Sequence, residues 1–235
     1  MTETAANVPS GHHPVLLPET EAPPGFLWTR MRSDPQYAPE HMALEAVRLL
    51  GPEAAIWTDH MREEFPALTA DELAMLAIKR FTTLGRISGS VSGAGELPGA
   101  VLDVGVLAWT HSRMVLHIAA AYGLDPAAGE RAADLLVLQR VHKGPSTARL
   151  SLGVAAGRER ASRLFSGMAV RPLSGVVVKL GVRLSQMAGV RTAKRVFAKV
   201  MPGAKIMLGM WVNSAATRDL ADRACCRYRE AAPAR

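Results

Sequence analysis

The chain of 235 residues carries a net charge of +7, with 28 Lys and Arg against 21 Asp and Glu. Hydrophobic residues make up 49% of it but aromatic residues only 5%, which favours helices packed through Ala, Val, Leu and Met over a β-sandwich. The two cysteines are the neighbours Cys225 and Cys226, so a disulfide framework is excluded and a reducing cytoplasm is expected. We expect no Sec-type export signal, because the first residues lack its basic and apolar regions.

The first 37 residues are rich in Pro, Gly and polar groups. This composition predicts a flexible arm over residues 1–37, with Phe26 and Trp28 as its points of contact with the rest of the chain. A helical pattern begins at Pro39, and Gly51-Pro52 predicts an interruption in it. The helical domain is therefore expected to span residues 38–235.

Thr69 followed by Glu72 is the capping-box pattern and predicts the start of the next helix. That helix is expected to run towards three glycines spaced four apart, Gly85, Gly89 and Gly93. Glycines at this spacing line one side of a helix and let another backbone approach closely. We favour a tight helix crossing over a role in membrane packing, because each glycine costs about 1 kcal/mol of helix stability and needs a packing reason.

A long apolar helix is expected from about Ala100 to Tyr122, with a C-terminal stop at Gly123. Asp125 followed by Pro126 predicts the start of the next helix, to about residue 142, and further helices are expected near 146–166, 172–187, 190–200 and 203–229. No run of uncharged residues in this part reaches the roughly 20 that a bilayer requires. Because spacings of three to four recur throughout, the sequence predicts an all-α fold, a compact multi-helix bundle.

Asp103, Thr110 and His117 lie seven residues apart on the apolar helix and so share one face. With Asn213 of the last helix they form a candidate buried polar site. We expect Asp103 to be buried or half-buried with a basic partner or helix-end amides, because an unpaired charge there is costly. The functional alternative is a metal or acid–base site, in place of polar residues that only pair with an acidic or basic neighbour. No metal and no cofactor are expected, since the cysteines lack the spacing of a zinc site.

Charge is divided between the two halves of the chain. Residues 1–141 hold 10 Lys and Arg against 17 Asp and Glu, whereas the residues after 141 hold 18 against 4. Within the basic half, segments 172–187 and 190–200 place basic and apolar residues on different helix faces, which is typical of helices on anionic membranes. The candidate binding residues are Arg171, Lys179, Arg183, Arg191, Lys194, Arg195 and Lys199. A solvated face is an equal alternative, and we expect no nucleic-acid partner, because few aromatic residues interleave with these charges.

Four stretches carry a family resemblance. Residues 89–103, with a Gly-rich turn, a Pro and an Asp, and residues 118–125, with an Ala-rich end and Tyr-Gly-Leu-Asp, resemble the EcsC family. Residues 199–204 and 213–221 resemble the family's other signature, so the resemblance covers roughly 70–229. It implies a bacterial protein of the cytoplasm or inner membrane face, in a family whose founding member is encoded beside an ABC transporter. It implies no reaction.

Three functions are therefore weighed. The first is a non-enzymatic helical accessory protein, peripheral on the cytoplasmic membrane face, that binds anionic lipid and is associated with a transporter. The second is an enzyme or small-molecule-binding protein with a site near Asp103 and His117. The third is a soluble protein whose basic half docks an acidic protein partner.

Overall fold

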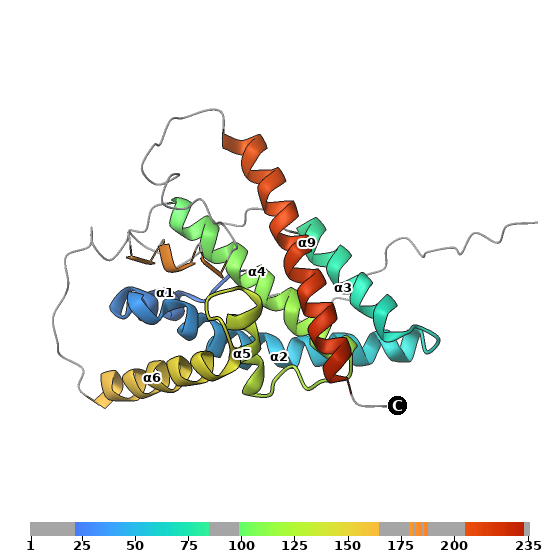
Figure 1. Ribbon diagram of the computed structural model, residues 1–235, viewed down its shortest axis with the longest axis horizontal. Coiled ribbons are helices and arrows are strands. Elements are labelled where there is room, and N and C mark those ends of the chain that lie inside the picture. The colour runs from blue at the N-terminus through green and yellow to red at the C-terminus, as the bar shows by residue number, and fades with distance from the viewer. Residues whose placement is uncertain are drawn as a thin grey trace, which may run out of the picture.

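The computed structural model describes residues 22–84, 99–164, 179–180, 182–184, 186–187 and 205–232. Over these residues every regular element is helical and there is no strand, which confirms the all-α prediction (Figure 1). The elements in chain order are α1 (Gly25–Ser33), η1 (Pro35–Tyr37), α2 (Ala38–Glu64), α3 (Ala70–Leu84), α4 (Gly99–Ala121), α5 (Glu130–Leu138), α6 (Pro145–Leu164) and α9 (Lys205–Ala231). Among the described residues, none of these helices combines the length and the apolarity needed to cross a bilayer.

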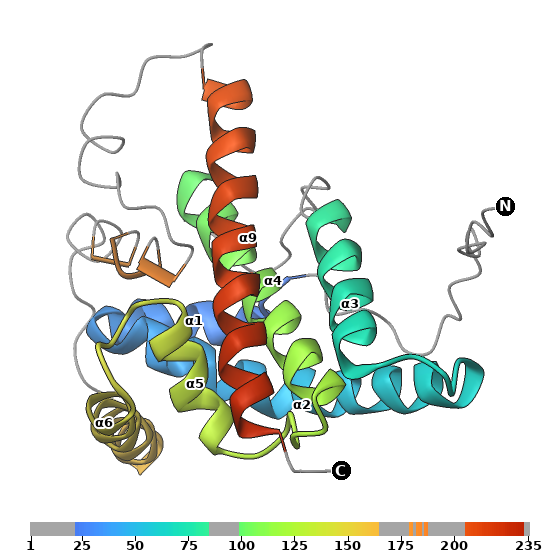
Figure 2. The same ribbon diagram turned by 45° about the vertical axis from the view of Figure 1, so that its right-hand side comes forward.

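Helix α4 is the centre of the bundle. It packs against α2, α3, α5 and α9, and every residue from His111 to Tyr122 is buried. A helix that is covered on all sides must be apolar all round, which is why this segment is rich in Ala, Val, Leu and Ile. Figure 2 shows α9 crossing in front of α4, while α6 and α3 lie at opposite ends of α2.

The prediction of a flexible arm over residues 1–37 is wrong for residues 22–37. These residues form α1 and η1, and Leu27, Trp28 and Met31 are fully buried. Trp28 packs on Gly105 of α4 so closely that a Cβ there would lie 2.1 Å from its Cη2 atom. Phe26, the other predicted contact point, is 48% exposed. The first 21 residues lie outside the described part of the chain.

The predicted interruption at Gly51-Pro52 is also wrong, because α2 continues through Pro52 to Glu64. Proline removes one helical hydrogen bond, and a helix of 27 residues packed along its length tolerates that loss. Gly51 has a different role. A Cβ at this position would lie 2.7 Å from the Cα of Ala127, so the glycine lets the turn after α4 approach α2.

Local signals at two helix ends are confirmed. The Thr69 amide donates to the Glu72 carboxylate at 2.8 Å, and the Glu72 amide donates to the Thr69 hydroxyl at 3.2 Å, so the capping box opens α3. At the end of α4, Gly123 has a φ of 81°. Its amide and that of Leu124 donate to the carbonyls of α4's last turn, at 2.9 and 3.0 Å, which is the Schellman arrangement.

The helix predicted to start after Asp125 begins later, at Glu130. Asp125 caps a turn instead, because its carboxylate accepts from the Ala127 amide at 2.8 Å. The helix also ends earlier than predicted, at Leu138, where the Gln139 amide still donates to the Leu135 carbonyl at 2.9 Å. Arg140 then turns the chain with a positive φ of 59°.

Only parts of the predicted segment 172–187 are described, and those parts are helical. Leu180, Leu184 and Met187 are buried while Lys179 is exposed, as the spacing of apolar and basic residues predicts. The predicted helix at 190–200 lies outside the described residues. So do Gly85, Gly89, Gly93, Arg171, Arg191, Lys194, Arg195 and Lys199.

Candidate functional site

The polar residues predicted to share a site on α4 do not come together. Asp103 is exposed, so the prediction of a buried carboxylate is wrong; the first turns of α4 are covered on one side only. Thr110 is half-buried, and its hydroxyl donates back to the Val106 carbonyl at 3.0 Å. Asp103 and His117 are separated by 14 residues, or about 21 Å of helix. The side chain of Asn213 lies outside the described residues.

His117 belongs to a different cluster, which joins α2, α3 and α4. Its Nδ1 lies 2.9 Å from the Arg113 carbonyl, and its ring packs against Trp57 and Phe81 with centroid distances of 5.2 and 4.8 Å. Arg113 donates from Nε and Nη2 to one oxygen of Glu53, at 2.8 and 2.5 Å. Burial lowers the pKa of His117 to about 3, so the ring is neutral. The cluster fixes three helices against one another.

Two further buried polar contacts hold α4 to its other neighbours. His111 Nε2 lies 2.9 Å from the Thr217 hydroxyl of α9, and Gln139 donates to the Ser112 hydroxyl at 3.0 Å. Burial lowers the pKa of His111 to about 4. Over the described residues, no group of three or more His, Cys, Asp and Glu side chains is arranged to hold a metal ion. The contacts of His111, Ser112, Arg113 and His117 thus join α4 to the elements around it.

Helix α6 has an outward face that the core does not use. Its inward face buries Ala148, Leu152 and Ala155. On the opposite face Leu150 is 73% and Val154 47% exposed, and their spacing of four puts them side by side along the helix. A Cβ added at Gly153 or Gly157 would meet no atom within 4 Å. Helix α6 thus carries an exposed apolar stripe, Leu150, Gly153, Val154 and Gly157, which faces open space.

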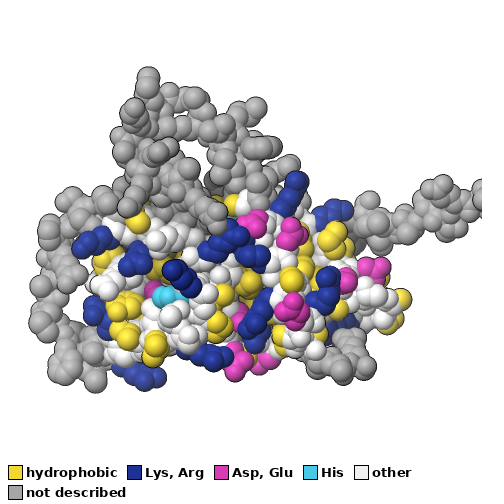
Figure 3. All heavy atoms as spheres, in the orientation of Figure 1, with side chains coloured by type: hydrophobic (Ala, Val, Ile, Leu, Met, Phe, Trp, Pro, Cys, Tyr) yellow, Lys and Arg dark blue, Asp and Glu magenta, His cyan; other side chains and the backbone are white. Residues whose placement is uncertain are grey.

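Arginines flank the apolar stripe on both sides. At about 100° per residue, Arg149 and Arg160 lie within about 20° of each other on one flank, and Arg158 lies on the other. Arg149 and Arg160 are exposed, and within the described part of the chain neither forms an ion pair. Figure 3 shows hydrophobic and basic side chains gathered over α6 on this face of the molecule. This surface is not predictable from the sequence, because α6 is apolar on both of its faces.

Polar contacts with the acidic half fix the rotation of α6. Glu40 of α2 accepts from His142 at 2.8 Å and from Ser151 at 2.5 Å. Arg158 donates to Asp34 at 2.9 Å from Nε and 3.1 Å from Nη2. Burial alone would raise the pKa of Asp34, but hydrogen bonds from His41 and Arg158 outweigh it, so this pKa lies below its usual value. These contacts keep the apolar stripe turned outward.

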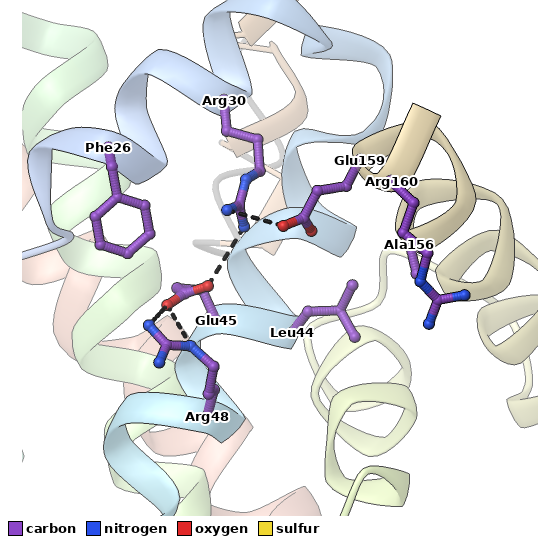
Figure 4. A pocket seen from close by; sticks show the side chains of 8 residues that line it. All are labelled: Phe26, Arg30, Leu44, Glu45, Arg48, Ala156, Glu159 and Arg160. Atoms are coloured by element: carbon purple, nitrogen blue, oxygen red, sulfur yellow. Dashed lines mark hydrogen bonds and ion pairs between the residues drawn. The ribbon is translucent and has the colours of Figure 1, made fainter. Parts of the chain in front are cut away.

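A hollow of about 700 Å³ opens between α1, α2 and α6, beside the Arg160 flank (Figure 4). Its apolar lining comes from Phe26, Leu44 and Ala156. Its charged lining comes from Arg30, Glu45, Arg48, Glu159 and Arg160.

Arg30 links the two glutamates of this hollow. Arg30 contacts Glu45 at 3.3 Å and Glu159 at 2.9 Å, and Arg48 Nε donates to Glu45 at 2.8 Å. The guanidinium of Arg30 also lies 5.6 Å from the centre of the Phe26 ring. The hollow therefore combines fixed charges with an exposed aromatic wall.

Comparison with known proteins yields one match. The model of the EcsC protein family matches residues 57–230, which is more than half of the chain. A search of curated proteins and a search of solved structures found no match. The matched range begins within α2 and includes α3, α4, α5, α6 and most of α9. The chain therefore belongs to the EcsC protein family.

Proposed function

We propose that this protein is a non-enzymatic accessory protein that binds the anionic surface of the cytoplasmic membrane face through α6. The observation that carries the proposal is the exposed apolar stripe with Leu150 and Val154 between flanking arginines. This arrangement is typical of helices that lie in the interface plane of a membrane. A transporter as the membrane partner is a further part of the proposal, supported by the genomic setting of the family's founding member.

The exposed stripe removes a conflict between folding and membrane binding. In segment 172–187 the apolar residues Leu180, Leu184 and Met187 are buried, so they cannot enter a bilayer without leaving the core. Leu150 and Val154 already face outward, and their insertion requires no unfolding. Lys179 and Arg183 can add electrostatic attraction only. We therefore assign the apolar part of membrane binding to α6.

The expected affinity of α6 is modest. A fully buried Leu or Val side chain contributes about 1.5–3 kcal/mol, and the exposed fractions of Leu150 and Val154 reduce their joint contribution to about 2 kcal/mol. Arg149, Arg160 and the exposed Lys143, two residues before α6, add about 1 kcal/mol each near anionic lipid. A total of about 5 kcal/mol corresponds to a Kd of a few hundred micromolar. The membrane attachment is thus weak and reversible.

Vesicle co-sedimentation tests this proposal. The protein is expected to sediment with phosphatidylglycerol-rich vesicles at low salt, to bind phosphatidylcholine vesicles poorly, and to detach largely in 1 M salt, where the Debye length falls to about 3 Å. The double variant Leu150→Gln/Val154→Gln should lose most of the binding without a change in melting temperature.

The matched control is Ile56→Gln/Met75→Gln, which alters two exposed apolar residues on α2 and α3. This variant should bind as the unaltered protein does. Equal loss in both variants, or no binding of the unaltered protein to either vesicle, would reject the membrane role and favour an acidic protein partner.

A further inference from the structure

Building on the proposed membrane binding, we infer that the hollow between α1, α2 and α6 binds the headgroup of one anionic phospholipid, a phosphodiester with an attached apolar chain. Arg160 belongs both to this hollow and to the flank of the apolar stripe. When Leu150 and Val154 lie in the apolar region of the membrane, an arginine on the flank reaches the level of the phosphates. The hollow is then open to a headgroup from the side.

The charges of the hollow match a single negative charge. Its lining holds three arginines and two glutamates, and both glutamates are occupied by Arg30 and Arg48. Arg160, which has no ion pair among the described residues, supplies the one charge in excess. A phosphodiester carries one negative charge, whereas a phosphomonoester carries between 1.5 and 2, roughly, at neutral pH. The balance therefore favours a diester.

Two arginines of the lining have donors to offer a phosphate. Arg48 donates hydrogen bonds from Nε and Nη2 to the Glu45 carboxylate. Because its side chain is 62% exposed, its Nη1 group can donate to a ligand. All N–H donors of the Arg160 guanidinium are available to a ligand, which suits the bidentate recognition of phosphate oxygens. Figure 4 shows these two guanidinium groups on either side of Leu44. A phosphate above Leu44 would lie between them.

An apolar wall completes the hollow. Phe26 is 48% exposed although it lies on the helix that buries Trp28. Leu44 and Ala156, which also line the hollow, are half-buried. A volume of about 700 Å³ lies within the range of small-molecule sites, about 300–1,000 Å³. Five of the eight lining residues precede residue 57, where the family match begins. The headgroup site is thus a feature of this chain and not of the matched region alone.

Calorimetric titration of the full chain with dihexanoyl phosphatidylglycerol, below its micelle-forming concentration, tests the site without a membrane. Saturable binding to one site is expected, at least about tenfold tighter than binding of dihexanoyl phosphatidylcholine. Arg160→Gln should weaken binding by about tenfold. The matched control Arg149→Gln removes an exposed arginine from the same flank but outside the hollow, and it should change the affinity by less than about twofold.

Soluble anions separate a lipid from other sources of phosphate. Glycerophosphoglycerol, the same diester without acyl chains, should bind more weakly than the lipid, and Phe26→Ser should weaken only the binding of the lipid. Equal binding of glycerophosphoglycerol and lipid would overturn the lipid assignment. Equal binding of inorganic phosphate, or equal effects of Arg160→Gln and Arg149→Gln, would overturn the site itself.

The two proposals fail separately. If Leu150→Gln/Val154→Gln abolishes vesicle binding while Arg160→Gln leaves the titration unchanged, the membrane surface stands and the headgroup site falls. If the short-chain lipid binds through Arg160 while the unaltered protein does not bind vesicles, the headgroup site is supported and the membrane role is rejected.

Discussion

Replacement of Gly105 by Ala tests how tightly α1 is packed on the central helix. A Cβ at this position would lie 2.1 Å from Cη2 and 2.9 Å from Cζ2 of Trp28, whose ring is fully buried. Overpacking of a core costs about 1–3 kcal/mol, and an overlap this deep against a rigid ring belongs at the upper end. The gain in helix propensity from Gly to Ala returns about 1 kcal/mol. The free energy of unfolding should therefore fall by about 2 kcal/mol.

Urea unfolding followed by circular dichroism measures this loss. Gly157→Ala is the matched control, because no atom lies within 4 Å of its added Cβ, and it should stabilise the protein by up to about 1 kcal/mol. In a Trp28→Leu background the penalty of Gly105→Ala should largely disappear, since the two sites share the contact. Opposite signs for the two glycines are the essential result. A stabilising Gly105→Ala, or an equal penalty with and without Trp28, would refute the packing of α1 on α4.

Two other predictions concern the buried polar residues of α4. Glu53→Gln should destabilise the protein by about 3–5 kcal/mol in the same urea assay, because it removes the carboxylate that pairs with the buried Arg113 charge. Glu53→Leu/Arg113→Met should cost much less. His111 and His117 have folded-state pKa values of about 4 and about 3, against 6.5 for an ordinary histidine, so the unfolded chain binds more protons between these values. Stability should therefore fall as the pH drops from about 6.5 towards 4, and His117→Gln should flatten that slope in denaturant titrations at several pH values.

Features that depend on a few neighbouring residues are predictable from the sequence. The capping box at Thr69 and Glu72 and the stop at Gly123 are examples, because backbone groups at helix ends need partners that only certain residue types supply nearby. The long apolar helix is predictable for a similar reason, since a buried helix must be apolar all round. These signals established the all-α class and most helix positions.

Features that depend on distant segments are not predictable in this way. Gly51-Pro52 predicts an interruption of the helix, yet Gly51 allows the close approach of Ala127, 76 residues later in the chain. The Pro-rich composition around residues 22–37 concealed a helix, although Leu27, Trp28 and Met31 have helical spacing. Asp103 lies on the same helical face as buried residues, but the sequence does not say where the bundle ends.

The choice of face on α6 shows the same limit. Leu150 and Val154 form one apolar row, and Leu152 with its neighbouring alanines forms another. A helix pattern with two apolar rows does not reveal which row meets the core. The fold settles the question, because the polar contacts of Glu40 and Asp34 hold α6 in one rotation. The candidate site was missed in the sequence for this reason.

The division of charge along the chain has a structural explanation, which reduces the number of basic residues that are available to an anionic partner. Basic residues of the second half pair with acidic residues of the first: Arg158 with Asp34, Arg227 with Asp134, and Arg229 with Asp71. Part of the basic excess is therefore used to join the two halves, and paired charges attract a membrane less than unpaired ones. The arginines that matter for an anionic partner are those that form no ion pair. Among the described residues of α6 these are Arg149 and Arg160, and they border the apolar stripe, where their charges and its hydrophobic area act on the same surface.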